Sequence, residues 1–115
     1  MKTARAFKNG EKGKPIFLGD IENAVAARFG LTREAMRSLT HARAVARPRQ
    51  IAMFLAREIT GHSLPRIGRH FGRDHTTVLH AVRRIGKLTT ADPRFAAEVE
   101  GCRELLARAR EGEAP

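Results

Sequence analysis

The chain has 115 residues, of which 42% are hydrophobic, and a formal net charge of +10. This length suits one compact domain with its own core, and the hydrophobic content excludes a wholly disordered chain. No apolar run approaches the roughly 18 residues of a transmembrane helix, and the basic N-terminus lacks the apolar segment of a secretory signal. The single cysteine, Cys102, excludes an internal disulfide. We therefore expect a soluble cytoplasmic protein.

The positive charge is concentrated in the middle of the chain. Residues 28–87 carry a net charge of +10, whereas residues 1–27 carry +2 and residues 88–115 carry −2. Clustered positive charge attracts a polyanion, because binding releases the counterions held by the polyanion. The distribution predicts that the central segment binds nucleic acid; a merely basic, soluble surface is the alternative.

Apolar residues at helical spacing predict an all-α fold, a helix-turn-helix bundle of about six helices, with no strand pattern. Asp20 is expected to cap a first helix that stops at Gly30. Thr32 is expected to cap a short second helix that buries Met36 and Leu39.

Residues 40–47 are basic and poor in large apolar side chains, so an exposed loop or a frayed helix end is expected there. Pro48 suits the first turn of a third helix, because its missing N–H would be unpaired at that place. Gly61 is expected to end this helix, Ser63 to cap a short fourth helix, and Gly72 to permit a sharp turn.

Asp74 is expected to cap a fifth helix that buries Val78, Val82 and Ile85, and Asp92 to open a final helix. The final helix carries a regular apolar stripe, with Cys102 as a small core residue. The predicted organisation has three parts: a flexible basic arm at 1–14, a helix-turn-helix domain at 15–91, and a C-terminal helix and tail at 92–115 packed on the domain. The alternative for the last part is the seam of a weak homodimer.

Residues 63–80 predict two short helices joined by a tight turn, and the second helix opens with short polar side chains. Thr76 and Thr77 each offer a hydroxyl and a methyl group to base edges in the major groove. Asp74 can accept from the amine of cytosine, and His75 can donate to a purine or a phosphate. Plain capping and first-turn polarity are the alternatives for each residue alone, but the block as a whole is far more specific.

Three stretches resemble the C-terminal DNA-binding domain, domain IV, of the bacterial chromosomal replication initiator DnaA. They are Val45-Ala46-Arg47-Pro48-Arg49-Gln50, His62-Ser63-Leu64-Pro65 and Arg73-Asp74-His75-Thr76-Thr77-Val78-Leu79-His80-Ala81. The likeness covers residues 18–88, and the last stretch is the signature of the family. It implies an all-helical domain of Trp-repressor-like type that binds a short duplex sequence, the DnaA box.

The resemblance also implies which residues touch DNA. The implied base contacts are Asp74, His75, Thr76, Thr77, Pro65, His41 and Arg43. The implied phosphate contacts are Arg47, Arg49, Gln50, Arg57, Ser63, Leu64, Arg73, His80 and Arg84. No catalytic, cofactor-binding or metal site is expected, because the five histidines are scattered and lack partners at zinc-ligand spacing.

Two departures from the family pattern affect DNA reading. The family usually has Phe-Gly-Gly-Arg-Asp in the turn, and the stretch from Phe71 to Asp74 is one glycine shorter. This predicts a tighter turn or a rotated reading helix. The family also places an arginine in the adjacent minor groove, where the matching position holds His41 and the nearest arginine is Arg43. A shorter, half-charged imidazole predicts weaker or altered minor-groove readout.

The sequence thus predicts a protein that binds double-stranded DNA at sites resembling DnaA boxes, as a stand-alone regulator of transcription or replication initiation. It lacks the Gly-x-x-x-x-Gly-Lys-Ser/Thr loop of an ATPase, so we expect no enzyme activity and no cofactor, small-molecule substrate or membrane partner. A nucleoid-associated monomer or weak homodimer is expected. The alternative is a protein-interaction module that keeps the fold without specific readout. An RNA-binding protein is less favoured, because Trp and Tyr are absent.

Overall fold

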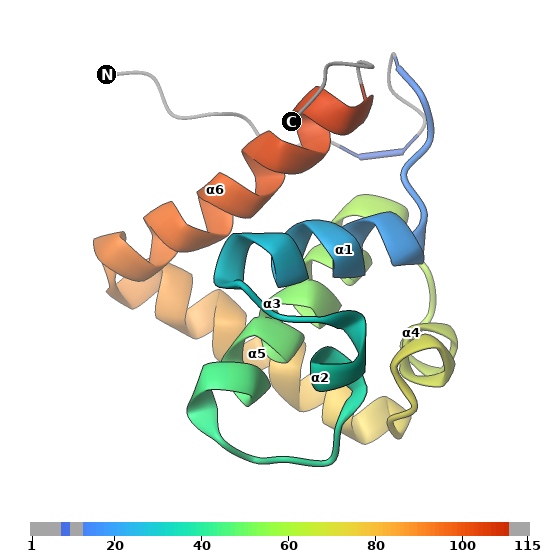
Figure 1. Cartoon of the computed structure of the whole chain (residues 1–115), viewed down its shortest axis with the longest axis vertical. Helices are drawn as coiled ribbons and strands as arrows, with labels where there is room; N and C mark the ends of the chain where they lie inside the picture. The colour runs from blue at the N-terminus through green and yellow to red at the C-terminus, as the bar shows by residue number, and fades with distance from the viewer. Residues whose placement is uncertain (1–7, 10–12, 111–115) are drawn as a thin grey trace.

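The computed structural model describes residues 8–9 and 13–110. This part of the chain contains six α-helices and no strand (Figure 1), which confirms the predicted all-α helix-turn-helix fold. The helices are α1 (Leu18–Phe29), α2 (Arg33–Arg37), α3 (Arg43–Thr60), α4 (Leu64–Phe71), α5 (His75–Ala91) and α6 (Pro93–Arg110).

Helix α3 is the centre of the bundle. It packs against α1, α2, α4 and α5, and its side chains Ile51, Leu55 and Ile59 are at most 2% exposed. Each fully buried side chain of this size contributes about 1.5–3 kcal/mol through the hydrophobic effect. Helix α6 packs on α1 and α5, and it buries Cys102 and Leu106 as predicted from its apolar stripe.

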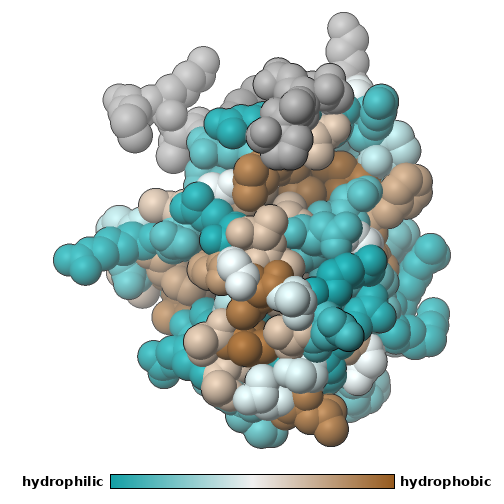
Figure 2. Space-filling view, in the orientation of Figure 1, coloured by the Kyte–Doolittle hydropathy of each residue, from teal (hydrophilic) through white to brown (hydrophobic). Residues whose placement is uncertain are grey.

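The α2–α3 loop and the beginning of α5 lie at the same end of the molecule. Both lie at the lower end of the view in Figure 1, far from the C-terminal half of α6. Figure 2 shows apolar side chains through the centre of this view and hydrophilic side chains gathered on its right. None of the described helices combines the length and apolar character needed to cross a membrane.

Most helix ends lie where the sequence predicts them. Gly30, Gly61 and Gly72 directly follow α1, α3 and α4. The hydroxyl oxygens of Thr32 and Ser63 each accept a hydrogen bond from the amide N–H three residues later. These caps satisfy amide groups that have no partner inside the helix.

Helix α1 begins at Leu18, two residues before the predicted cap. The carboxylate of Asp20 accepts a hydrogen bond from the amide of Phe17 at 2.8 Å, so Asp20 satisfies the start of the helix from within its first turn. The prediction that Asp20 is the N-cap is therefore wrong.

Helix α3 begins at Arg43, and Pro48 lies inside it. The prediction that Pro48 opens the helix is wrong, and the first turn occupies part of the expected loop. Proline removes one amide donor and crowds the carbonyl four residues earlier, at Ala44. Ala44 is exposed near the helix end, where water can reach its carbonyl.

One further boundary differs from the prediction. Helix α2 ends at Arg37, so Leu39 lies outside the helix and is 82% exposed instead of buried. Helix α6 begins at Pro93, directly after Asp92, as predicted.

The predicted basic arm at 1–14 lies mostly outside the described residues, as does the tail after residue 110. Within the arm, the side-chain amide of Asn9 forms hydrogen bonds with the backbone of Ile16 at 2.7 and 2.8 Å. The backbone N–H of Asn9 donates to the carbonyl of Ile59 at 3.0 Å. The described part of the arm is therefore bonded to the domain.

Candidate nucleic-acid interface

A tight turn sets the position of α5 relative to α4. Gly72 has φ 66° and ψ 36°, a left-handed conformation that glycine adopts without steric cost. The amide of Arg73 donates to the carbonyl of Gly68 at 2.8 Å. A β-carbon on Gly68 would lie 2.4 Å from the carbonyl oxygen of Arg73. Helix α4 and the turn therefore touch backbone to backbone, which fixes where α5 begins.

Gly68→Ala should destabilise the domain, because the obstacle to the added methyl group is backbone that cannot rotate away. We expect a loss of about 1–3 kcal/mol in the free energy of unfolding, measured by urea denaturation. Gly86→Ala is the matched control, since its β-carbon would meet only the ring of Phe54 at 3.8 Å. Alanine favours a helix over glycine by about 1 kcal/mol, so the control should gain stability or stay unchanged. Equal losses in both variants would contradict the close backbone contact.

The predicted reading residues form an exposed block at the beginning of α5. Asp74, His75, Thr76 and Thr77 are all exposed. Asp74 is the N-cap residue of α5, as predicted, although its side chain makes no capping hydrogen bond to the backbone. Its carboxylate accepts a short hydrogen bond from the Thr76 hydroxyl, which lowers the pKa of Asp74. The other carboxylate oxygen lies 3.2 Å from Nδ1 of His75. These polar groups bond to one another at the surface and remain accessible to a ligand.

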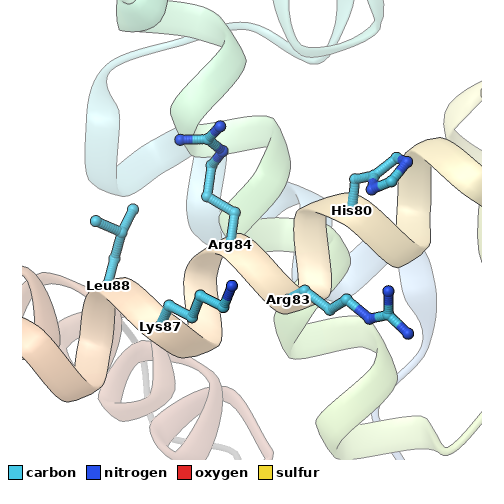
Figure 3. A pocket seen from close by; sticks show the side chains of 5 residues that line it. All are labelled: His80, Arg83, Arg84, Lys87 and Leu88. Atoms are coloured by element: carbon cyan, nitrogen blue, oxygen red, sulfur yellow. The ribbon is translucent and has the colours of Figure 1, made fainter.

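Helix α5 carries cationic side chains beyond this block. His80, Arg83, Arg84 and Lys87 line an open hollow of about 580 Å³ together with Leu88. Figure 3 shows that Arg84 and Arg83 diverge from the helix, whereas Lys87 lies across the front of it. Spacings of three and four residues place these side chains on one face of α5, which thus offers a run of positive charge to a polyanion.

A second hollow lies between α5 and the loop that joins α2 to α3. Its volume is about 450 Å³, and its lining includes His41, Gln50, Arg73, Thr77, His80 and Arg84. The structure therefore brings together predicted DNA contacts from three separate parts of the sequence. Gln50 is one of these predicted contacts, and its side-chain oxygen is buried without a hydrogen-bond partner.

Arg47 lies among other arginines. Burial, followed by the positive charges of Arg43 and Arg84, lowers the pKa of Arg47. The guanidinium of Arg47 also lies 5.8 Å from the centre of the Phe95 ring, over its face. An anionic ligand would relieve the repulsion between these neighbouring cations.

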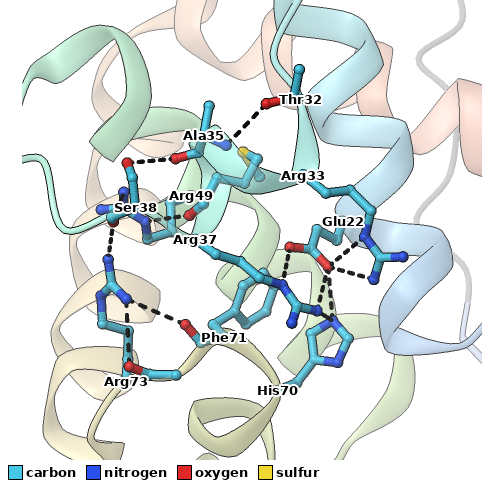
Figure 4. Close-up of polar contacts among 12 residues, drawn as sticks. Glu22, Thr32, Arg33, Ala35, Arg37, Ser38, Arg49, His70, Phe71 and Arg73 are labelled. Atoms are coloured by element: carbon cyan, nitrogen blue, oxygen red, sulfur yellow. Dashed lines mark hydrogen bonds and ion pairs between the residues drawn. The ribbon is translucent and has the colours of Figure 1, made fainter.

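Arg49, for which the sequence predicts a phosphate contact, lines the second hollow but is almost wholly buried. It is 6% exposed, and its guanidinium donates to the carbonyls of Met36, Ser38 and Thr40 at 2.7, 2.8 and 3.3 Å. Arg73 also donates to the carbonyl of Ser38, at 2.5 Å (Figure 4). The structure gives Arg49 a positioning role beneath the loop, because its donors are directed into the protein.

A buried carboxylate that joins three helices was not predicted from the sequence. Glu22 of α1 is fully buried; it accepts from Arg33 and Arg37 of α2 at 2.9 Å and lies 3.0 Å from Nε2 of His70 in α4 (Figure 4). Burial raises the pKa of Glu22, but the hydrogen bonds from Arg37 and Arg33 outweigh it and hold the pKa at about 2. The cluster holds α2, which leads into the α2–α3 loop, and α4, which leads into the turn before α5.

The remaining predicted contacts lie at the ends of α3 and α4. The guanidinium of Arg57 donates to the carbonyls of Gly61 and His62 at 3.1 and 2.6 Å. Ser63 and Pro65 are exposed at the beginning of α4, and the Leu64 between them is half-buried. His41 and Arg43 are exposed on and beside the α2–α3 loop. The DNA contacts expected of these residues stay predictions.

The fold and this cationic surface define a helix-turn-helix DNA-binding domain. The family described as bacterial dnaA protein helix-turn-helix matches residues 18–85. The chain belongs to this family.

Chromosomal replication initiator proteins DnaA from several bacteria are similar to the chain. The protein of Sphingopyxis alaskensis is 47% identical over 104 residues, which are 89% of this chain and 23% of that protein. That of Gluconobacter oxydans is 48% identical over 92 residues, 79% of this chain and 19% of that protein. That of Caulobacter vibrioides is 50% identical over 95 residues, 82% of this chain and 19% of that protein. The chain spans about a fifth of the length of these relatives.

Proposed function

We propose that the chain binds double-stranded DNA sequence-specifically, at sites resembling the DnaA box, and regulates transcription or replication initiation by occupying them. The first turn of α5 reads base edges in the major groove. The cationic side chains around it bind the phosphates of both strands. Such a protein is located on the nucleoid.

The observation that carries this proposal is the arrangement around the first turn of α5. Four exposed polar side chains, Asp74 to Thr77, stand at the helix N-terminus, and α5 contributes His80 and Arg84 to two adjoining cationic hollows. Short side chains at a helix N-terminus can approach base edges closely, and flanking cations fix the register through the phosphates. The positive end of the helix dipole adds to the attraction of phosphate.

The shortened turn is compatible with this arrangement. Gly72 and Arg73 alone lie between Phe71 and the Asp74 that precedes α5, yet the reading block remains exposed. Arg73 spans from the turn to the α2–α3 loop through its bond to Ser38. The turn therefore links the reading helix to the loop, which supports a single binding surface made of both.

Fluorescence anisotropy with a labelled box duplex and a scrambled duplex tests the proposal. We expect the box to bind about 1,000-fold more tightly at physiological salt. Both affinities should fall steeply as salt rises from about 50 to 200 mM. Equal affinity for the two duplexes would contradict specific reading. Absence of binding even at low salt would favour a protein-interaction module instead.

A further inference from the structure

Leu39 is exposed to an unusual degree for a large apolar side chain. Its exposed fraction is 82%, and Phe17, with 66%, is another such side chain among the described residues. Leu39 lies in the loop between α2 and α3, the same loop that carries His41. Single exposed leucines are common, so exposure alone assigns no role to Leu39.

The loop that presents Leu39 is held from beneath. Arg49 bonds to the carbonyls of Met36, Ser38 and Thr40, on both sides of Leu39. Arg73 bonds to Ser38 from the turn before α5. Two guanidinium groups therefore fix the backbone around an apolar side chain, and they couple its position to the reading helix.

The hollow between this loop and α5 suits one sugar-phosphate strand. Leu39 and His41 line it on the loop side, and Thr77, His80 and Arg84 line it on the side of α5. Its basic lining matches the charge of a phosphate backbone. A strand that follows this hollow has the major groove, with α5, on one side. Its other side faces the neighbouring minor groove, where the loop lies.

We propose that Leu39 is a specificity-determining residue that enters the minor groove beside the site read by α5. This inference rests on the proposed function, since it requires α5 in the major groove. In the minor groove, a G·C pair differs from an A·T pair by the protruding N2 amine of guanine. Leu39 cannot hydrogen-bond this amine and competes with it for space. It therefore selects A·T pairs by packing against their edges and the adjoining sugars, in the manner of other apolar minor-groove contacts.

Duplexes that differ only in base pairs flanking the box test the role of Leu39. Each flanking position in turn carries A·T, G·C or inosine·C; inosine lacks the N2 amine but keeps the major-groove pattern of guanine. At one or two adjacent positions, the wild type should bind A·T and inosine·C about fivefold more tightly than G·C. Leu39→Ala should lose this preference. Leu39 is exposed, so the variant should also retain the wild-type melting temperature.

Phe17→Ala is the matched control, because it also removes an exposed large apolar side chain, at the start of α1. It should keep the full preference of the wild type. A preference for A·T that survives in Leu39→Ala would overturn the inference. Equal affinity for duplexes with inosine·C and with G·C would also overturn it, because the preference would then come from the major groove. Failure of the wild type to distinguish box from scrambled duplex would instead refute the proposed function.

Discussion

Thr76→Ala combined with Thr77→Ala should strongly reduce discrimination between box and scrambled duplexes while salt-dependent binding to any duplex persists. Thr76 and Thr77 are both exposed in the first turn of α5. A good base contact is worth about 1–3 kcal/mol, so the ratio of the two affinities should fall about 30- to 1,000-fold. Anisotropy titrations on both duplexes measure this ratio. Alanine favours the helix, so loss of folding does not account for the result.

Arg84→Ala is the contrast for the double variant. Arg84 lines both hollows on α5 and is expected to contact phosphate, which carries no sequence information. Its removal should weaken both duplexes alike and reduce the slope of log affinity against log salt by about 1. Retention of full box discrimination in the threonine variant would show that α5 does not read the bases.

Glu22→Gln should cause the largest loss of stability among the substitutions considered. The neutral amide leaves Arg33 and Arg37 without their buried charge partner, although both arginines are about half exposed and can turn to water. We expect the free energy of unfolding to fall by about 2–3 kcal/mol at pH 7, measured by urea denaturation. Glu98→Gln is the control, since Glu98 pairs with Arg28 only at 3.7 Å and at the surface. It should change stability by less than about 1 kcal/mol.

The contribution of Glu22 should depend on pH in a defined direction. Its pKa is about 2 in the folded protein against an ordinary value of 4.5. A lowered pKa stabilises the fold above the ordinary value, and this contribution, at most about 3 kcal/mol, is lost as the pH falls from 4.5 towards 2. The difference in stability between wild type and Glu22→Gln should therefore shrink across this range. A difference that stays constant down to pH 2.5 would contradict the ion-pair account.

The sequence predicts helix ends well where one residue carries the signal. Gly61 and Ser63 lie where predicted, because a left-handed turn and a hydroxyl cap depend on local chemistry. The errors occur where the same residue type fits two positions. Asp20 serves the helix start equally well from inside the first turn, and Pro48 is tolerated further into α3 than its usual place.

In the candidate site, too, residues were predicted correctly where the signal is local in the sequence. The reading block from Asp74 to Thr77 was predicted because its residues are consecutive in sequence, and the structure finds all four exposed. The buried positions of Arg49 and Glu22 could not be predicted, since their partners lie between 9 and 48 residues away. In the sequence, an arginine that supports a loop from beneath looks the same as an arginine that binds phosphate.

The two buried ionic groups connect folding to DNA binding. Glu22 holds α2 and α4 together, and Arg49 holds the loop that leaves α2. Both therefore stabilise the relative positions of the loop and the reading helix. Substitution of either residue should impair DNA binding together with stability, whereas substitution of the exposed threonines should impair specificity alone.

An amide NMR titration with the box duplex tests whether the first turn of α5 enters the major groove. We expect the largest shifts at residues 74–80 and 39–43, with little change along the outer side of α1 and α6. Shifts confined to the groove of α1 and α6 around Ala24, Ala27 and Leu105, with the amides of residues 74–77 unmoved, would contradict it.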